Sequence, residues 1–386
     1  MTTEQFIAEH LNDDVHELAL RYHNAKVDMA LALRQIEARQ ILRKKVPLWS
    51  DNEELLFPAH LSIEQCSSEA TARYKASLLH GQSFADLTGG LGVDSFFISQ
   101  GFRQADYVEQ NAELCALAEH NLKSLTIHHE TAESYLRRCD PVDCIFLDPS
   151  RRDEHGRKTI SIADCSPNVS ELQDLLLQKA QRVMVKLSPM LDISKALREL
   201  RCVKEVHVVA VANECKELLF VLEPSFEGRT ALTCVNLQTD QPSVTFDMEE
   251  ERSCQTLLEK EIGRYLYEPN AALMKAGCFA VLSHRYGIGQ PHPNSHLFTS
   301  DKGIPDFPGR CFEVEGWAPY HKRIKQTLLA GVKEASIATR NFPLTVAELR
   351  KTLGIADGDR HFLFATTDHG GQKVIISCRK AKFIGN

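Results

Sequence analysis

Apolar and polar positions alternate with a helical period over residues 1 to 80. The segment HELALRYHNAKVDMALALRQIEARQIL places apolar residues three and four positions apart, with charges between them and no proline or glycine. This pattern predicts helices that stop near Pro47. A further helix is expected from Ser68 to Leu79, because Ser67 and Ser68 can accept hydrogen bonds from its free N–H groups. Residues 1–80 are therefore predicted to be a helical N-terminal region.

From Phe84 to about Leu222 the pattern changes to short apolar strands that alternate with helical stretches. The expected strands are SFADL, ADYVE, LTIHH, CIFLD, RVMVKL, EVHVVAVA and ELLFVLE. Such alternation predicts a parallel sheet with helices on both faces, in an α/β domain over residues 81–235. The last two strands are separated only by residues 213–216, too few for a helical crossover, so they should form an antiparallel hairpin.

The pattern is weaker after Glu223. A strand is expected at TALTCVNL, a helix at AALMKAGCFAVLS and a strand at RCFEVEGW, within a linker and small domain over residues 236–318. A second small α+β domain is expected over residues 319–386. It should contain a long helix from about Lys322 to Arg340, a helix at TVAELRKTLG, and the strands HFLFATT and KVIISCRK joined by a glycine turn.

Length and charge support several domains with different surfaces. The 386 residues exceed the usual size of a single core. The net charge is −7, but from Pro319 onward twelve Lys and Arg face five Asp and Glu, a net +7 that leaves −14 for the preceding residues. The C-terminal segment is a basic module on an acidic body. Taken alone, a basic excess of this size is more often a solvated surface than a binding site.

Composition predicts a cytoplasmic protein without a membrane segment. No run of about eighteen uncharged apolar residues is present, and the first residues, MTTEQFIAEHLNDD, are acidic and polar where a secretory signal needs a basic and then apolar stretch. The twelve cysteines are scattered without a CxxC pair. We expect them to be reduced and largely buried, and no metal site is predicted.

A glycine turn after the first strand is the strongest candidate for a ligand site. In FADLTGGLGVD, Thr88 precedes Gly89, Gly90 and Gly92, which allow a sharp bend and close approach of a ligand to the backbone. By itself this turn also fits a strand-to-helix connection without ligand, or a dinucleotide site. Asp86 favours a third interpretation, a site for a positively charged ligand. A carboxylate at this strand end can hold turn amides or a ligand ammonium group.

Two later strand ends extend this candidate site. Glu109 lies seventeen residues after Gly92, a distance at which an acid can accept hydrogen bonds from both hydroxyls of a ribose. Gln110 follows it. Thr131 and Ala132 come after the third strand, where small side chains and backbone can contact an adenine. A cationic methionine moiety fits these acids better than a pyrophosphate does.

These motifs resemble those of class I S-adenosylmethionine-dependent methyltransferases, which have a Rossmann-like sheet. Asp86, Gly90 and Gly92 match the first cofactor motif and Glu109 matches the ribose-binding acid. The resemblance implies S-adenosylmethionine as cofactor. An α/β class I methyltransferase sheet with a helical N-terminal region and small α+β C-terminal domains is the fold that it implies.

A second motif, Asp148-Pro149-Ser150-Arg151-Arg152, is similar to the Asp-Pro-Pro motif of nucleic-acid methyltransferases. In those enzymes the carboxylate and a proline carbonyl receive the amino group of a target base. An aromatic residue usually follows the prolines, whereas Ser150 and Arg151 stand here. Uracil-C5 methyltransferases need a cysteine after the next strand, but that segment reads VMVKLSPM, without a thiol.

Across its whole length the chain resembles a bacterial family of class I methyltransferases that ends in a THUMP-like domain. The matching segments are TARYKASLL, DPSRR, YEPNAALMKAG, FPGRCFEVEGW and LRKTLGIADGDRHFLFATT. The resemblance implies a ferredoxin-like domain within residues 236–318 and a THUMP-like domain over 319–386. THUMP domains bind structured RNA, so it also implies RNA, such as tRNA or rRNA, as the partner.

The sequence thus predicts methyl transfer to RNA, at a base nitrogen. Asp148, Pro149 and Ser150 are the candidate catalytic residues, and cations near the motif are candidates for binding phosphate or the base: Arg151, Arg152 and Lys186. Three alternatives stay open. They are a methyltransferase for a small molecule or protein, a non-catalytic RNA-binding factor that retains the fold, and a dinucleotide oxidoreductase. The oligomeric state is not predicted.

Overall fold

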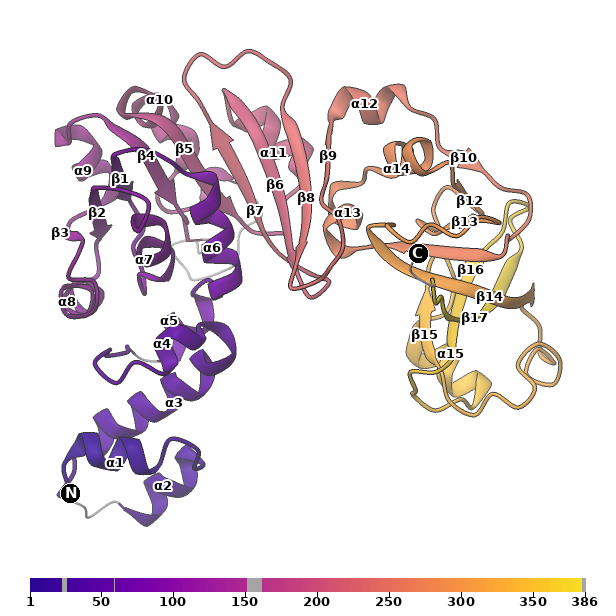
Figure 1. The fold of residues 1–386 in the computed structure, drawn as a ribbon, viewed down its shortest axis with the longest axis horizontal. Helices are drawn as coiled ribbons and strands as arrows, with labels where there is room; N and C mark the ends of the chain where they lie inside the picture. The colour runs from indigo at the N-terminus through magenta and orange to yellow at the C-terminus, as the bar shows by residue number, and fades with distance from the viewer. Residues whose placement is uncertain (23–25, 59, 151–161, 384–386) are drawn as a thin grey trace. The chain divides into compact units, whose positions relative to one another are not determined.

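The chain folds into two compact units (Figure 1). The structure, a computed structural model, describes residues 1–22, 26–58, 60–150 and 162–383. The first unit comprises Met1–Val206 and Glu217–Gly228, and the second comprises His207–Lys216 and Arg229–Asn386.

Helices form the N-terminal part of the first unit, as predicted. They are α1 (Thr3–Glu9), α2 (Val15–Arg21), α3 (Met29–Lys45), α4 (Pro47–Ser50), α5 (His60–Gln65) and α6 (Glu69–Leu78). α3 ends just before Pro47, whose ring cannot continue a helix. Ser68 caps α6, because its hydroxyl accepts a hydrogen bond from the Thr71 N–H at 3.3 Å. Buried apolar side chains from α1, α2 and α3 form a small core: Phe6, Leu18, Ala32 and Ile36.

A mostly parallel sheet follows these helices along the chain. Its strands are β1 (Ser83–Asp86), β2 (Gln104–Glu109), β3 (Thr126–His129), β4 (Val142–Leu147), β5 (Ala180–Leu187), β6 (Val203–Val211) and β7 (Glu214–Leu222). They lie in the order β3-β2-β1-β4-β5-β7-β6, and the sheet continues with β8 (Ala231–Leu237) and β9 (Val244–Asp247). β1 to β5 pair in parallel, and β7 runs antiparallel to β5. Ala212 and Asn213, both with positive φ, form the two-residue turn between β6 and β7. The predicted parallel sheet and the antiparallel hairpin of β6 and β7 are confirmed, but the hairpin is not the end of the sheet.

Helices connect the parallel strands, as the alternating pattern predicted. They are α7 (Val93–Ser99), α8 (Ala112–Asn121), α9 (Ala132–Arg138), the short 3₁₀ helix η1 (Ile162–Asp164), α10 (Val169–Lys179) and α11 (Ile193–Glu199). Because β1, β2, β3 and β4 run parallel, their carboxyl ends meet at one edge of the sheet. Ligands of open α/β sheets bind at this edge.

The second unit contains a second sheet. After the antiparallel pair β8 (Ala231–Leu237) and β9 (Val244–Asp247), eight strands lie in the order β10-β12-β13-β11-β14-β17-β16-β15. Their bounds are β10 (Leu257–Leu258), β11 (Tyr265–Pro269), β12 (Gly289–Gln290), β13 (Phe298–Ser300), β14 (Gly309–Pro319), β15 (Ser336–Thr339), β16 (Phe362–Thr367) and β17 (Lys373–Lys380). The helices are α12 (Met248–Ser253), α13 (Ala271–Ala276), α14 (Phe279–Tyr286) and α15 (Val346–Leu353). β14 pairs with both β11 and β17. One sheet therefore contains strands from both predicted small domains, residues 236–318 and 319–386.

Two helix predictions in the second unit were wrong. The long helix from Lys322 to Arg340 is replaced by turns and by β15. Gly331 has a φ of +84°, and Ile324 is buried in the core around β15 to β17, so tertiary packing overrides local helix propensity. The helix expected at AALMKAGCFAVLS is divided into α13 and α14 at Gly277, which has a φ of +71°.

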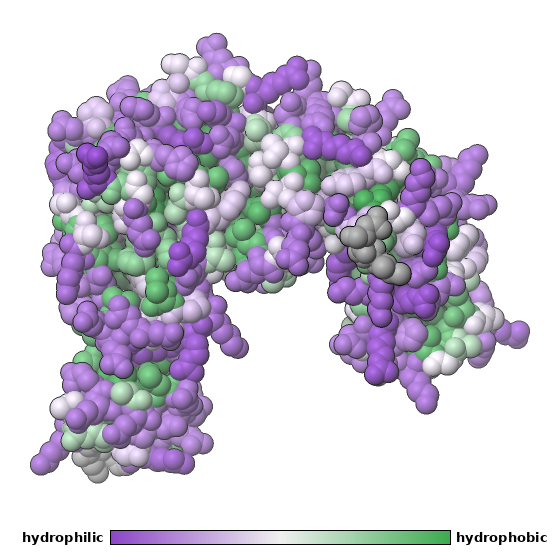
Figure 2. Space-filling model, in the orientation of Figure 1, coloured by the Kyte–Doolittle hydropathy of each residue, from purple (hydrophilic) through white to green (hydrophobic). Residues whose placement is uncertain are grey.

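The surface and the cysteines agree with a globular protein. Polar side chains predominate on the face shown in Figure 2, with apolar side chains scattered between them. Within the described part of the chain, no helix is long and apolar enough to cross a membrane. All twelve cysteines are free thiols, as expected.

Candidate functional site

The glycine turn between β1 and α7 packs tightly on the neighbouring strand. A Cβ atom at Gly89 would lie 2.1 Å from the ring of Tyr107, which is fully buried on β2. The Tyr107 hydroxyl donates a hydrogen bond to the Gly90 carbonyl at 2.6 Å. Gly92 begins α7 with a φ of +86°, a conformation that L side chains rarely adopt. Packing against Tyr107 therefore requires glycine at position 89, and backbone geometry favours it at position 92.

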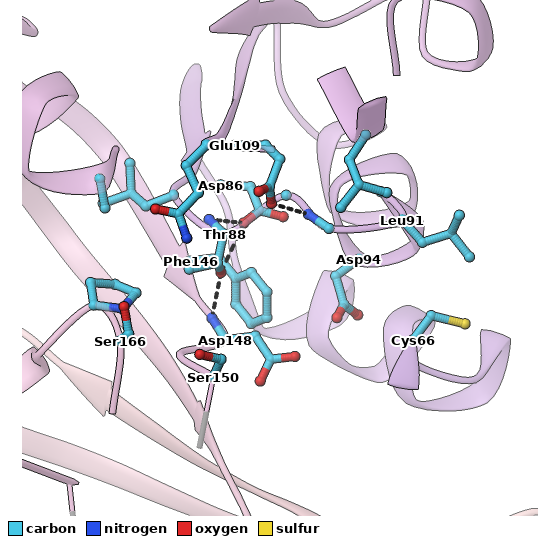
Figure 3. A pocket seen from close by; sticks show the side chains of 18 of the residues that line it. Cys66, Asp86, Thr88, Leu91, Asp94, Glu109, Phe146, Asp148, Ser150 and Ser166 are labelled. Carbon is cyan, nitrogen blue, oxygen red and sulfur yellow. Dashed lines mark hydrogen bonds between the residues drawn. The ribbon is translucent and has the colours of Figure 1, made fainter. Parts of the chain in front are cut away.

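Asp86 holds this turn from the end of β1 (Figure 3). Its carboxylate accepts hydrogen bonds from the Thr88 N–H at 3.0 Å and from the Ser95 hydroxyl at 2.6 Å. The side chain is 1% exposed, and burial raises its pKa to about 7. Asp86 was predicted to hold turn amides or a ligand ammonium group. The hydrogen bond from the Thr88 N–H corresponds to the first of these roles.

Glu109 and the residues after β3 lie at the same edge. The Glu109 carboxylate accepts hydrogen bonds from Gly90 N–H at 3.0 Å and from Asn111 N–H at 2.8 Å, which ties the end of β2 to the glycine turn. Thr131 caps α9, since its hydroxyl accepts from the Ser134 N–H at 3.2 Å. The structure thus brings together the cofactor residues that the sequence predicted.

Asp148 follows β4 and faces this site. Its N–H donates to the Thr88 hydroxyl at 2.6 Å, and its carboxylate accepts from the Lys186 ammonium group at 2.5 Å. In Figure 3 the carboxylate points toward the side of the pocket where Asp94 and Cys66 lie.

The other motif residues differ in their position relative to the cavity. Ser150 lines it and exchanges two backbone hydrogen bonds with Ser166, at 2.8 and 3.0 Å. Pro149 is buried and does not line it. Arg151 and Arg152 lie outside the described residues.

These strand ends surround one cavity of about 310 Å³, which is in the range of small-molecule sites. Predicted residues that line it are Asp86, Thr88, Gly89, Gly90, Gly92, Glu109, Gln110, Thr131, Ala132, Asp148 and Ser150. Among the described residues, no lysine or arginine lines the cavity. Six acidic side chains do: Asp86, Asp94, Glu109, Glu130, Glu133 and Asp148. Such a lining favours a ligand with positive charge over a pyrophosphate.

Lys186, predicted to bind substrate, takes part in an ion pair instead of lining the cavity. Its side chain is 13% exposed and lies 3.9 Å from Asp94 as well as 2.5 Å from Asp148. Burial opposes its charge, but Asp148 and Asp94 raise the pKa of Lys186 above the ordinary value. Lys186 is therefore an ammonium group that faces Asp148 from the end of β5.

Several lining residues were missed by the sequence analysis. Gln65, Cys66 and Ser67, which precede α6, close one side of the cavity. Burial raises the pKa of Cys66 to about 11, so its thiol stays protonated near neutral pH. One signal could have drawn attention to this region. Lys75 lies three residues after Ala72 on the buried face of α6, an unusual place for lysine.

Comparisons with known proteins agree with this geometry. Residues 265–308 match a family model described as a ferredoxin-like domain, and residues 309–380 match one described as THUMP domain-like. The crystal structure of a candidate methyltransferase from Porphyromonas gingivalis W83 has a TM-score of 0.88 and 34% identity, and the match covers 98% of each chain. An uncharacterised S-adenosylmethionine-dependent methyltransferase from Mycobacterium tuberculosis is 23% identical over 295 residues, 76% of this chain and 79% of the relative.

Proposed function

The chain belongs to the bacterial family of class I S-adenosylmethionine-dependent methyltransferases that end in a THUMP-like domain, and we propose that it methylates structured RNA, such as tRNA or rRNA. The enzyme class and the cofactor are those of the family. One observation supports the proposal most strongly. The acidic cavity lies beside Asp148 in a chain whose residues 309–380 match a THUMP-like domain.

The residues around the cavity fit S-adenosylmethionine. When bound, this cofactor supplies an electrophilic methyl group on a positively charged sulfur. The carboxylates of the lining compensate positive charge, and Glu109 would accept hydrogen bonds from ribose hydroxyls. Thr131 and Ala132 would contact the adenine, while Asp86 would keep the glycine turn in place.

Asp148 would receive the acceptor group of the substrate. Methyl transfer is a direct displacement, so the protein contributes alignment and electrostatics and no covalent intermediate. The motif after β4 predicts a base nitrogen as acceptor. Arg151 and Arg152 would bind a phosphate of the RNA, by the charge-assisted pairing that arginine favours.

Exposed cations in the THUMP-like residues suggest where RNA binds. Lys322, Arg323 and Lys325 are all exposed in the turn segment after β14. Replacing Lys322 and Arg323 with glutamine should weaken binding of total RNA. It should also reduce the slope of log affinity against log salt by about one for each phosphate that the variant no longer neutralises. Point substitutions are preferable to deleting residues 319–386, since β14 and β17 share one sheet.

The decisive experiment is transfer of labelled methyl groups from S-adenosylmethionine to RNA from cells that lack this protein. Label in the RNA fraction is expected, and it should fall at least tenfold with Asp148→Ala. Lys260→Gln, a change of an exposed lysine outside the THUMP-like residues, should leave both transfer and RNA binding unchanged. Transfer to a small molecule or protein with none to RNA would refute the proposal.

A further inference from the structure

Five charged side chains of alternating sign extend from the interior of the first unit to the candidate site. Lys75 donates to the two carboxylate oxygens of Glu217, at 2.7 and 2.9 Å, and lies 3.2 Å from Asp94. Asp94 lies 3.9 Å from the Lys186 ammonium group, which donates to Asp148 at 2.5 Å. The order is therefore Glu217, Lys75, Asp94, Lys186 and Asp148, and we call these residues the charge chain.

The charge chain is costly to bury, which makes a purely structural role a poor explanation. Lys75 is 0% exposed and Glu217 is 3% exposed. Buried ion pairs can often be replaced by apolar side chains of similar volume without loss of stability. Its most exposed member is Asp148, at 38%, and this end lines the cavity. The charges thus lead to the place where the methyl acceptor must lie.

Ser67 fixes the two ammonium groups relative to one another. Its hydroxyl oxygen accepts from Lys75 and from Lys186, each at 3.2 Å, and donates to Asp94 at 2.6 Å. Burial opposes the ionisation of Asp94, but Lys75 and Lys186 lower the pKa of this carboxyl below its ordinary value. Lys186 is therefore held as a cation beside Asp148 by groups from α6 and α7.

The sign of the charge that develops on the acceptor separates two kinds of substrate. An amino nitrogen that attacks a methyl group becomes more positive before it loses a proton, and a neighbouring ammonium group would oppose this change. A hydroxyl oxygen is a weak nucleophile until its proton leaves, and it becomes more negative as that happens. A carboxylate that takes the proton and a cation that stabilises the oxygen both favour this reaction.

The side chains that line the site also disfavour an extruded base. Nucleic-acid methyltransferases with a motif of this kind usually place an aromatic side chain after it, and that side chain stacks on the flipped base. Phe146 is the sole aromatic side chain among the described residues that line the cavity, and it is only 1% exposed. Ser150 stands where an aromatic residue would be needed, and its backbone is bonded to Ser166. A ribose hydroxyl lies next to the RNA backbone and can be reached without base stacking.

We propose that the methyl acceptor is the 2′-hydroxyl of a ribose in RNA, with Asp148 as proton acceptor and Lys186 as the cation that stabilises the oxygen. This inference rests on the proposed RNA methyltransferase function, and it replaces the base nitrogen that the motif after β4 predicts as acceptor. The hydroxyl oxygen forms a bond to the methyl carbon, and the carbon–sulfur bond breaks with its electron pair remaining on sulfur. The hydroxyl proton passes to the Asp148 carboxylate and then to solvent. Lys75 and Glu217 are positioning residues that act through Lys186.

Alkaline hydrolysis of labelled RNA tests the acceptor atom directly. Alkali cleaves RNA through attack of a free 2′-hydroxyl on the adjacent phosphorus, so a methylated ribose protects the following linkage. After reaction of the full chain with methyl-labelled S-adenosylmethionine and RNA from cells that lack it, label is expected in alkali-stable dinucleotides. Label in mononucleotides, on the bases, would overturn this inference and leave RNA methylation intact. Absence of label from RNA would overturn both.

Substitution of Lys186 tests the roles within the site. Lys186→Met should lower kcat about 10²–10³-fold, the usual effect of losing one group that stabilises an oxyanion. Its affinity for S-adenosylhomocysteine, measured by calorimetry, should change less than about threefold, because Lys186 faces Asp148 and does not line the cavity that would hold the cofactor. Lys186→Arg keeps the positive charge and should restore part of the rate. A kcat for folded Lys186→Met within twofold of the unmodified enzyme would overturn the role of Lys186.

Two further variants complete this test. Lys195→Met removes an exposed lysine of α11, paired with Glu199, and should leave kcat unchanged. Glu217→Gln should lower kcat without a matching rise in KM for RNA, because Glu217 is buried and acts on the acceptor through Lys75 and Lys186. An equal effect of Lys195→Met and Glu217→Gln on kcat would contradict the positioning role.

Discussion

Replacing Glu217 with glutamine removes the buried counter-charge on which Lys75 depends. Both residues are almost completely buried, at 0 and 3% exposure, so water cannot replace the missing partner. Breaking a buried ion pair by removing one partner costs about 3–5 kcal/mol. Asp94 remains 3.2 Å from Lys75, so we expect the low end, a loss of about 3 kcal/mol in the free energy of unfolding of the first unit.

Replacing the partner, Lys75, should lower the free energy of unfolding further. Lys75→Met leaves Glu217 without a cation and also removes one of the two cations near Asp94, so about 5 kcal/mol is expected. The double variant Lys75→Met with Glu217→Gln removes both charges of the pair. It should be more stable than Lys75→Met alone, which would show coupling between the two side chains.

Tryptophan fluorescence can report on this unit alone. The chain has two tryptophans, Trp49 in the first unit at 2% exposure and Trp317 in the second at 37%. In a Trp317→Phe background, thermal unfolding followed at Trp49 should show a midpoint lower by about 6–12 °C for Glu217→Gln, at about 2–4 °C per kcal/mol. A loss below about 1 kcal/mol for each single variant, or strict additivity in the double variant, would refute the coupling.

Three other substitutions examine the cofactor turn. Gly89→Ala should destabilise the first unit and abolish binding of S-adenosylhomocysteine in calorimetry, because its Cβ would lie 2.1 Å from the ring of Tyr107. Gly101→Ala, whose Cβ would meet its nearest atom at 3.7 Å, is the matched control, and equal effects would refute the steric argument. Glu109→Gln should raise the Kd for S-adenosylhomocysteine about 10- to 100-fold, as expected for charged hydrogen bonds; an unchanged Kd would exclude a role in binding. Asp86 has a folded-state pKa of about 7, above its ordinary value of 3.8, so the folded state keeps a proton that the unfolded chain has released, and stability falls as pH rises between these values. The stability of Asp86→Asn relative to the unmodified protein should therefore increase by up to about 4 kcal/mol between about pH 4 and 7, and then level off. Urea titrations at several pH values measure this difference, and a difference that does not change with pH would contradict the prediction.

Local patterns were sufficient to predict which residues lie together around the glycine turn. The strand ends that carry Asp86, Glu109 and Asp148 could be located because parallel strands bring their carboxyl ends to one edge. The glycine turn required only the properties of a short segment. Where the predictions failed, as in the helix from Lys322 to Arg340, the deciding interactions came from elsewhere. Ile324 is buried in a core with β15 to β17, and a local helix propensity cannot anticipate that packing.

The sequence by itself determined the sheet, the cofactor turn and the placement of Asp148 beside them. Only the tertiary structure decided what surrounds Asp148. Lys186 is 38 residues away from Asp148 along the chain, and Lys75 is 142 residues away from Glu217. No periodicity or motif links such distant positions, since their pairing depends on which helix packs against which strand. Burial of these charges costs free energy unless they are paired, and this burial exists only in the folded chain.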